Sequence, residues 1–533
     1  METRTMKTRT IKTLKIFATI FSLLIATVSI YVFSRFTVDD AFITWRYGRN
    51  LIDFGVWNFN PSGLDPTQAY TNPIYAALAI IPSLMGWDVV LFFKLFSTML
   101  LVLFVYWFGK VTRGSWIMVF LLIGLPATVV HIYGGLETFL FVFLMGALLI
   151  ALHEEKNVSA IIICLLLFIT RPETWLLAAL LPLYLLISEK GTPGHTATFN
   201  PLKYYSEIKI QPIKAGIAAA ILATALSSYL LFHYLHFGNA LPNTFYIKKS
   251  GNFSPLNFIK FSFFLLPILP LLFVTKIKQI LLMAGIFGAM IISYSTSNLQ
   301  MDYSGRFAFH IFAPIYIYAT YLASKADGKI YGPAYNGLPN KAIITHSTLA
   351  KGALLFYLAA FALISDNIRT CAATYYPRAL ISHAELGKTI NHIAGKYGIR
   401  AYSFGDAGMA AYHSRINTLD NIGLGSSAVA KTGVNASLLE NYHVDLIVFH
   451  ADSKDIQLEA DNQKPIYEWA IKNHFVELCD IYWRKDFTFK VYSKTPISEI
   501  TELCAKSKQH NDVEDYDLLK KVVLVPPWKF WTE

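Results

Sequence analysis

The sequence predicts a polytopic α-helical membrane protein that ends in a soluble α/β domain. Of its 533 residues, 54% are hydrophobic and 15% are charged, whereas a soluble domain carries about 25% charged residues. Apolar runs of roughly 15–22 residues recur through the first two thirds of the chain, which is long enough to cross a bilayer. Residues 367–533 lack such repeated runs. We therefore expect a transmembrane domain over 1–366 and a soluble domain over 367–533.

The first apolar run, 16–36, is predicted to be a retained transmembrane helix. It is about 20 residues long and has no small-x-small cleavage site after it, so it does not match a signal peptide. The residues before it carry an excess of Lys and Arg over acids, which predicts a cytoplasmic N-terminus. The helix then places Asp39 and Asp40 at the outer surface of the membrane. A charged side chain there is energetically unfavourable unless it is solvated or has a role in function.

Later apolar runs bring the predicted number of transmembrane helices to about eleven. The segment 72–86 is also apolar, but it is only about 15 residues long and begins with a proline, so we expect a helix lying on the outer surface. This assignment leaves most basic loops on the cytoplasmic side and the C-terminal domain outside. The net charge of +11 is therefore interpreted as a topology signal and not as a nucleic-acid site. The further predicted spans are 88–109, 115–133, 137–152, 158–171, 173–188, 215–235, 257–275, 279–297, 307–323 and 352–365.

The C-terminal domain shows patterns of both helix and strand. An amphipathic helix is predicted over 386–397, and strands are predicted over 399–404, 445–449 and 487–492. The glycine-rich residues 405–408 are too few for a dinucleotide-binding motif, so we expect a turn. The four cysteines fit no metal-binding spacing. One lies in a membrane run and three lie in the tail, which allows one disulfide and leaves one thiol over.

Under this topology, every unusual polar cluster lies on the outer face. A membrane enzyme that uses a lipid-phosphate-linked donor needs a carboxylate to act on the acceptor hydroxyl. It also needs cations over the phosphate leaving group and a groove between helices for the lipid. The outward clusters supply candidates for the carboxylate and the cations: Asp39, Asp40, Glu137, Arg171, Glu173, Lys248, Lys249 and Arg306.

Each of these residues also has a simpler interpretation. Asp40 could cap a helix that begins at Ala41, and Glu137 could serve as a cap at a helix start. Arg171 and Glu173 could form a local ion pair, and Lys248 and Lys249 could be interface anchors. His310, one turn after Arg306, could be an ordinary buried histidine. These alternatives stay open at the level of sequence.

Several blocks resemble one family of membrane glycosyltransferases. Residues 39–50, the Asn-Pro pairs at 60–61 and 72–73, and the blocks 135–138, 171–173, 241–248 and 305–307 are similar to the GT-C glycosyltransferases. More narrowly, they resemble the mycobacterial terminal β-(1→2)-arabinofuranosyltransferase (AftB) family. Residues 405–408, Tyr412 and 420–424 resemble its periplasmic domain, although Asn421-Ile422 stand where that family pattern has Leu-x.

The resemblance implies a function for these residues. It implies transfer of a sugar, with D-arabinofuranose as the favoured candidate, from a polyprenyl-phosphate donor to a surface glycan, lipopolysaccharide or pilin at the periplasmic face of a bacterial inner membrane. Asp39 is the leading catalytic carboxylate and Asp40 its neighbour. Arg306, Lys248, Lys249 and Arg171 would bind the donor phosphate. The residues expected to bind substrate are Glu137, Glu173, Asn72, Asn243, Tyr246 and His310.

Other functions remain open. A divalent cation could be shared by Asp39, Asp40 and Glu137, because hard-ion sites have no fixed spacing. Whether the reaction inverts or retains the anomeric centre is not set by sequence. A transporter or flippase would need ionisable groups near mid-membrane or inverted repeats, and neither is evident. A non-catalytic membrane adaptor is a further alternative, and it predicts that changing Asp39 has no effect on sugar transfer.

Overall fold

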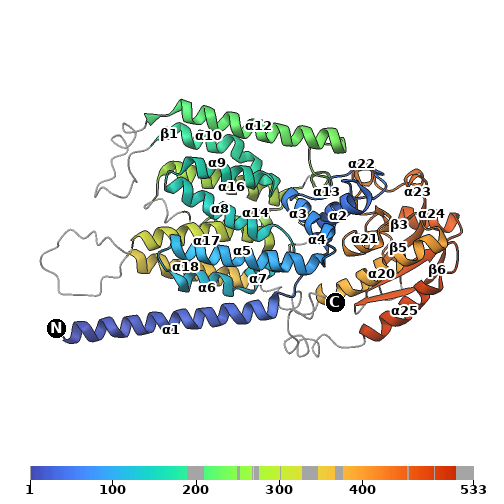
Figure 1. Cartoon of the computed structure of the whole chain (residues 1–533), viewed down its shortest axis with the longest axis horizontal. Coiled ribbons are helices and arrows are strands. Elements are labelled where there is room, and N and C mark those ends of the chain that lie inside the picture. The colour runs from blue at the N-terminus through green and yellow to red at the C-terminus, as the bar shows by residue number, and fades with distance from the viewer. Residues whose placement is uncertain are drawn as a thin grey trace.

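The chain forms a helical part followed by a part built on a β-sheet. The structure is a computed structural model, and it describes residues 2–188, 209–248, 252–266, 268, 275–299, 302–326, 346–365, 376–452, 455–484 and 487–511. The N-terminus and the sheet lie at opposite ends of the long axis (Figure 1). The short helices α2, α3, α4 and α13 lie where the two parts meet (Figure 1).

Five of the described helices are long and apolar enough to span a membrane by length and composition. They include α17 with the 3-10 turn η3 (Tyr303–Gly305) before it. No span-length helix outside this set was found in the described ranges, apart from one bent pair discussed below. The five are α1 (Glu2–Phe33), α5 (Val89–Val111), α12 (Pro212–Phe237), α16 (Ile277–Ser295) and α17 (Arg306–Ala326).

The predicted span 115–133 is broken into two helices. α6 (Trp116–Gly124) and α7 (Pro126–Tyr133) meet at an angle of 74°. The break falls at Leu125, because the residue before a proline is disfavoured in the α conformation and Leu125 is extended. If the pair counts as one span, the described helices give six. The eleven predicted spans are therefore not confirmed, and the membrane orientation stays a prediction.

The apolar stretches of the remaining helices are shorter than a full span. They pack among the long helices into a single hydrophobic core, and a two-stranded ribbon joins α10 to α12. These elements are α8 (Thr138–His153), α9 (Asn157–Phe168), η1 (Pro172–Leu176), α10 (Leu177–Leu186), β1 (Ile187–Ser188), β2 (Lys209–Ile210), α14 (Pro255–Phe263) and α18 (His346–Ile364).

The segment predicted to lie on the outer surface forms two short helices instead of one. α3 (Pro73–Leu78) and α4 (Ile80–Met85) are six residues each, and neither is long enough to span a bilayer. Both pack against α2 (Asp39–Phe54). The close approach depends on Gly48, because a Cβ at this position would lie 2.5 Å from the backbone of Ala79.

The C-terminal part contains a five-stranded sheet with the order β4-β3-β5-β7-β6. β3 pairs in parallel with both β4 and β5, and the other pairings are antiparallel. The predicted helix and three strands are present, with ends that differ by a few residues or more. The strands are β3 (Ala401–Phe404), β4 (Asn417–Asp420), β5 (Val444–Asp452), β6 (Val476–Arg484) and β7 (Phe487–Ser493).

Helices cover both faces of this sheet. One hydrophobic core lies between the sheet and α20 (Tyr376–Tyr397) with α25 (Ser498–Asn511). A second core lies between the sheet and α23 (Ala436–Tyr442) with α24 (Gln463–Lys472). The short helices α21 (Met409–Ser414) and α22 (Ser427–Thr432) follow β3 and β4. This three-layer arrangement confirms the predicted α/β character of the tail.

One disulfide links β6 to α25. It joins Cys479 and Cys504, which agrees with the prediction that the tail can form one disulfide. Cys164 is a buried free thiol in α9. The remaining cysteine, Cys371, lies outside the described residues.

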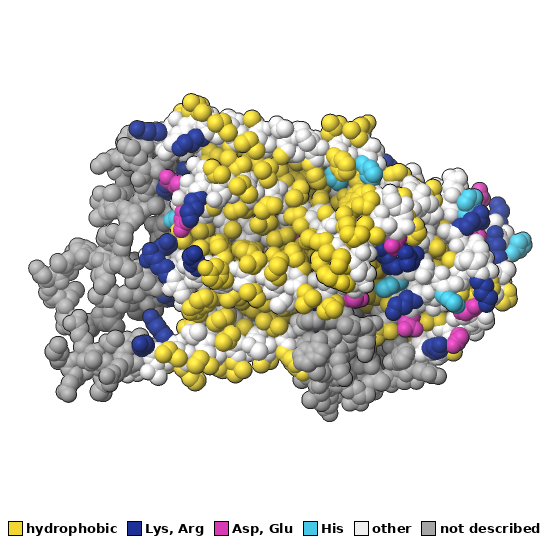
Figure 2. Space-filling model, viewed as in Figure 1, with side chains coloured by type: hydrophobic (Ala, Val, Ile, Leu, Met, Phe, Trp, Pro, Cys, Tyr) yellow, Lys and Arg dark blue, Asp and Glu magenta, His cyan; other side chains and the backbone are white. Residues whose placement is uncertain are grey.

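The surface of the helical part is largely apolar. Figure 2 shows a broad field of hydrophobic side chains over the middle of the molecule, with Lys and Arg gathered at the end away from the sheet and charges of both signs over the sheet part. Exposed side chains of α5, such as Leu95, Val102 and Tyr106, belong to the apolar surface. A large exposed apolar surface is what a bilayer requires of a protein embedded in it.

Candidate active site where the two parts meet

The two adjacent acids are set in place by the end of α1. The buried amine of Lys94 in α5 donates hydrogen bonds to the carbonyls of Ser34 and Phe36, at 2.8 and 2.5 Å. It also donates to the carbonyl of Tyr133 at the end of α7, at 2.8 Å. These bonds fix the exit of α1 and satisfy carbonyls that the helix leaves without partners. α2 therefore begins at a defined place.

Asp39 holds the C-terminal part against α2. Its carboxylate accepts hydrogen bonds from the backbone N–H groups of Gly408 and Met409, at 3.0 and 2.7 Å. An acid at this position suits the positive end of α21. Burial raises the pKa of Asp39 to about 6. Both carboxylate oxygens are thus engaged by the first turn of α21, a role that sequence did not anticipate for the residue expected to lead catalysis.

Asp40 is the more open of the two acids. Its side chain is half-buried, and no hydrogen bond or ion pair joins it to any other residue of the described ranges. Burial raises the pKa of the Asp40 carboxyl group. The positive charges of Lys248 and Arg306 act on the same group in the opposite direction. The capping alternative is wrong, because α2 begins at Asp39 with Val38 at the N-cap and not at Ala41.

Two of the predicted phosphate-binding cations lie near enough to Asp40 for their charges to act on its carboxylate. Lys248, at the end of α13 (Thr244–Lys248), is half-buried, and burial lowers the pKa of its amine while Asp40 opposes that effect. Arg306 is buried and directs Nε to the Thr138 hydroxyl at 3.3 Å. Lys249, the third predicted cation, lies outside the described residues.

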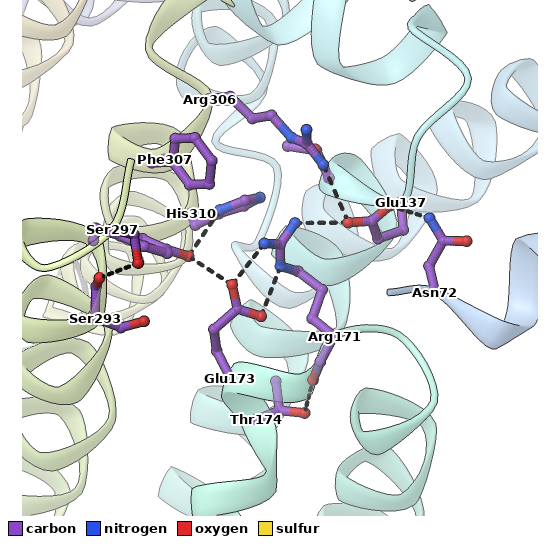
Figure 3. A network of polar contacts seen from close by, with 12 residues as sticks. Asn72, Glu137, Arg171, Glu173, Thr174, Ser293, Ser297, Arg306, Phe307 and His310 are labelled. Atoms are coloured by element: carbon purple, nitrogen blue, oxygen red, sulfur yellow. Dashed lines mark hydrogen bonds and ion pairs between the residues drawn. The ribbon is translucent and has the colours of Figure 1, made fainter. Parts of the chain in front are cut away.

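A buried polar network includes Arg306 (Figure 3). The fully buried Glu137 accepts bonds from Arg171 Nη1 at 2.6 Å and Arg306 Nη2 at 3.4 Å, and from the amide of Asn72. Glu137 precedes α8, but its side chain makes no capping hydrogen bond. Glu137 is thus the N-cap residue at the start of α8, as that alternative expected, while its carboxylate bonds three other segments of the chain.

Arg171 is shared between two acids in the same network. Besides Glu137, it bonds Glu173 through Nη2 at 2.6 Å and Nε at 3.2 Å. The tyrosine hydroxyl of Tyr294 links Glu173 to His310 Nδ1, at 3.4 and 3.1 Å. The local Arg171–Glu173 pair considered from sequence is present. Donors on all three guanidinium nitrogens of Arg171 are directed at protein carboxylates, so its role as a phosphate ligand stays a prediction.

The predicted substrate residues of the 241–248 block have different environments. The amide of Asn243 donates to the carbonyls of Gly423, Leu424 and Ser426, at 2.6, 3.1 and 3.2 Å. Its side chain thus connects the loop before α13 to the turn after β4. Tyr246 is 39% exposed, and its role in binding substrate stays a prediction.

The sheet part contributes acids and histidines that sequence analysis missed. Asp406 Oδ2 lies 2.8 Å from His383 Nε2 and 3.1 Å from His450 Nε2, and His450 Nδ1 lies 3.4 Å from Asp461 Oδ2. Burial alone would raise the pKa of Asp406, but His450 and His383 hold it well below its usual range. The residues come from four separate segments, so no local spacing announces them.

Hydrogen bonds from α2 and from the loop 55–72 join the helical part to the sheet part. Arg46 Nη2 donates to the carbonyl of Ile416 at 2.7 Å, and the N–H of Thr418 donates to Asn60 Oδ1 at 2.8 Å. The hydroxyl of Tyr442 donates to Asp65 at 2.9 Å. We call this set of contacts between residues 39–72 and the sheet part the junction. Asp39 and Asp40 lie at its edge.

The predicted shared cation finds no support in the described part of the chain. Among those residues, no group of three or more His, Cys, Asp or Glu side chains is arranged to hold a metal ion. Glu137 pairs with arginines and Asp39 with backbone N–H groups. Two of the three acids expected to share a cation, Asp39 and Glu137, therefore have other partners.

Comparison with known proteins gives a remote structural likeness. No protein-family model and no curated protein matches the sequence. The chain is similar to the oligosaccharyltransferase AglB of Archaeoglobus fulgidus bound to an inhibitory peptide and a dolichol-phosphate, with 13% identity, a TM-score of 0.46, and coverage of 91% of this chain and 74% of that one. The apo form of that organism's oligosaccharyltransferase gives 12% identity, a TM-score of 0.47, and coverage of 92% and 77%. These values describe a general resemblance of shape.

Proposed function

We propose that the chain is an integral membrane glycosyltransferase of the GT-C class. It moves a sugar, D-arabinofuranose being the first candidate, from a polyprenyl-phosphate donor to a glycan or protein acceptor at the cell surface. The proposed location is the bacterial plasma membrane, with the N-terminus in the cytoplasm and the domain 367–533 in the periplasm. The proposal rests on the residues at the junction and on the sequence blocks that resemble the family.

One observation carries this proposal: a half-buried carboxylate that has no partner among the described residues and on which the charges of two cations act. Asp40 has this environment, with Lys248 and Arg306 acting on it. An unpartnered acid in a partly desolvated place is costly, and such a group is a candidate for function. The cations fit a phosphate that gains charge as it leaves the sugar.

The geometry suggests that the two neighbouring acids have different roles. Asp40 takes the proton of the acceptor hydroxyl or holds that hydroxyl against the sugar carbon. Lys248 and Arg306 bind the departing polyprenyl phosphate. Asp39 bonds the first turn of α21 to α2 and thereby fixes the position of the sheet part relative to α2. The buried Glu137 pairs with Arg306 and with Arg171. Its carboxylate therefore orients the guanidinium of Arg306.

The test is a transfer assay with the full chain in lipid nanodiscs. Radiolabelled decaprenyl-phosphoryl-D-arabinofuranose is supplied with an envelope glycan extract, and label is counted in the fraction that organic solvent does not extract. We expect transfer by the unchanged protein and binding of decaprenyl phosphate in the micromolar range or tighter. Arg306→Gln and Lys248→Gln should each weaken decaprenyl phosphate binding by about tenfold or more.

A second arm does not depend on the choice of sugar. Mass spectrometry of surface glycans and surface proteins is compared between a deletion strain and its parent. Loss of one pentose or hexose from one acceptor supports the proposal and identifies both substrates. Unchanged surface glycans and proteins, together with no decaprenyl phosphate binding, would refute it.

A further inference from the structure

The parallel strands of the sheet end at the face that meets α2. β4 and β5 both pair in parallel with β3, and they lie on opposite sides of it. This makes the carboxyl end of β3 a topological switch point, which is where open α/β sheets bind ligands. Three polar residues lie at this edge: Asp406 after β3, Asn421 after β4, and His450 near the end of β5.

Asn421 carries an amide with no protein partner. Its side chain is 1% exposed, and neither its amide nitrogen nor its oxygen forms a hydrogen bond with any described residue. Burying such an amide is unfavourable unless something binds it. The amide is directed towards the residues that follow β3, because a Cβ at position 405 would lie 3.0 Å from Asn421 Oδ1 and 2.9 Å from His450 Cε1.

Asp406 presents an ionised carboxylate at the same edge. Its side chain is 27% exposed, while the two imidazoles that contact it are nearly buried. His450 also faces Asp461, so the ring lies between two carboxylates. The histidines hold Asp406 in place from the protein side and leave part of the carboxylate accessible.

This edge lies beside the proposed donor site. Residues 405–408 connect β3 to α21, whose first N–H groups bond Asp39. The charge of Asp406 acts on both Asp39 and Asp40. The cations Lys248 and Arg306 come from α13 and α17, whereas the Asp406 cluster belongs to the sheet part.

We propose that the carboxyl edge of β3, β4 and β5 binds the acceptor, and that this acceptor is a glycan whose hydroxyls contact Asp406 and Asn421. The inference rests on the proposed function and names its second substrate class. Carboxylate and amide groups accept and donate hydrogen bonds in one plane, which suits adjacent sugar hydroxyls. The half-buried ring of Trp483, 5.4 Å from the His383 ring, adds an aromatic surface nearby.

The test measures glycan binding and donor binding on the same full-length protein in nanodiscs. The probes are a printed array of bacterial envelope oligosaccharides, a matched array of surface-protein peptides, and decaprenyl phosphate. We expect the unchanged protein to retain envelope oligosaccharides and not peptides. Asp406→Asn should weaken glycan binding by about tenfold or more and leave decaprenyl phosphate binding within about twofold.

Asn421→Leu separates binding from folding. Leucine fills a similar volume and removes the unpartnered amide, so the variant should melt at the same temperature as the unchanged protein or higher. It should nevertheless lose about tenfold or more in glycan binding. A control is Asp445→Asn, because Asp445 is 29% exposed, pairs with Arg400 and lies at the opposite end of β5. This control should bind glycan normally.

The outcomes distinguish this inference from the proposed function. If the unchanged protein binds decaprenyl phosphate but retains no oligosaccharide, or retains peptides instead, the glycan inference is overturned and the transferase proposal stands. The inference is also overturned if Asp406→Asn and Asn421→Leu bind glycan as the unchanged protein does. If decaprenyl phosphate is not bound either, the proposed function itself fails.

Discussion

Asp39 and Asp40 are neighbours in the chain but have different environments. Asp39 is nine-tenths buried and bonded to the backbone of the sheet part, whereas Asp40 is half-buried and has no bonding partner among the described residues. An α-helix turns by about 100° per residue, so the two side chains leave α2 in different directions. The pair of acids that sequence treats as one motif therefore has one side chain bonded at the junction and one without a bonding partner among the described residues, on which the charges of Lys248 and Arg306 act.

The first residue-scale prediction concerns Asp40. Asp40→Asn should reduce sugar transfer by about 100-fold or more, because the amide cannot accept a proton. Melting temperature should stay close to that of the unchanged protein, since Asp40 makes no bond with another described side chain. Asp53→Asn is the control, because Asp53 lies in the last turn of α2 and pairs with Arg49 and Arg415. Full transfer by Asp40→Asn would exclude it as the base.

The second residue-scale prediction concerns Arg171. Arg171→Met leaves Glu137 and Glu173 without their closest cation in a buried place, and breaking a buried ion pair costs about 3–5 kcal/mol. We expect a large fall in melting temperature, partly recovered by adding Glu173→Gln. If Arg171→Met melts normally but no longer binds decaprenyl phosphate, the sequence-based role as phosphate ligand is supported over the structural one.

At the scale of helices and strands, α2 and α21 lie side by side: Asp39 bonds the first turn of α21, and Arg49 donates to the carbonyl of Tyr412 further along it. The contact has no room for a side chain at Gly408, where a Cβ would overlap the Asp39 carboxylate. Hydrophobic residues from α2, the loop 55–72, the end of α12 and α21 share one further core around Tyr47 and Phe59. The junction is thus packed as well as hydrogen-bonded, and its geometry sets the position of Asp40.

The element-scale prediction is that Gly408→Ala opens the junction. The methyl group should displace Asp39 and speed amide hydrogen exchange in α21 and in the first turn of α2, with a parallel loss of transfer. Gly395→Ala in α20 is the control, because a Cβ there meets nothing within 4 Å and alanine favours a helix by about 1 kcal/mol. Unchanged exchange in Gly408→Ala would contradict the close contact.

At the scale of the whole molecule, the sheet part is stabilised by a charge arrangement that depends on pH. Burial lowers the pKa of His450, but Asp406 and Asp461 raise it overall to about 10. Because this folded-state pKa lies above the unfolded value of about 6.5, the stabilisation is complete below pH 6.5 and is lost as pH rises through 10. His383 also faces Asp406 and belongs to the same cluster.

We therefore predict that melting temperature falls between pH 7 and pH 10 more steeply in the unchanged protein than in His450→Gln. The difference should correspond to about 3 kcal/mol of unfolding free energy. Differential scanning fluorimetry at both pH values measures it. Using the difference between two proteins removes the contribution of lysines and tyrosines that also titrate near pH 10. Equal slopes would show that His450 is not charged at neutral pH.

Sequence patterns predicted the elements better than the contacts between them. Apolar periodicity located most helices, and alternation located three of the five strands. The break at Leu125 and the two turns of 73–85 depend on local proline and packing effects that a hydrophobic run conceals. The outward blocks were expected to meet, and the structure joins Glu137 to Arg171 and Arg306 and places Asp40 within reach of the charges of Lys248 and Arg306.

The missed residues share one property: their partners are distant in the chain. His383, Asp406 and His450 form a cluster only after the sheet has assembled, and the block 405–408 gave no sign that Asp406 would meet two histidines. Lys94 falls inside an apolar run and looks like a misplaced charge until its three carbonyl acceptors are known. Such residues need tertiary structure because hydrogen-bond satisfaction is a property of the folded chain.

The bonds of the loop 55–72 have a consequence for protein engineering. Asn60 and Asp65 accept hydrogen bonds of 2.8 and 2.9 Å from β4 and α23 of the sheet part. A chimaera that exchanges only residues 367–533 with those of a relative would carry mismatched surfaces. Exchanging residues 39–72 together with the tail keeps both sides of the contact from one parent, and only such double grafts should yield hybrids with altered acceptor preference.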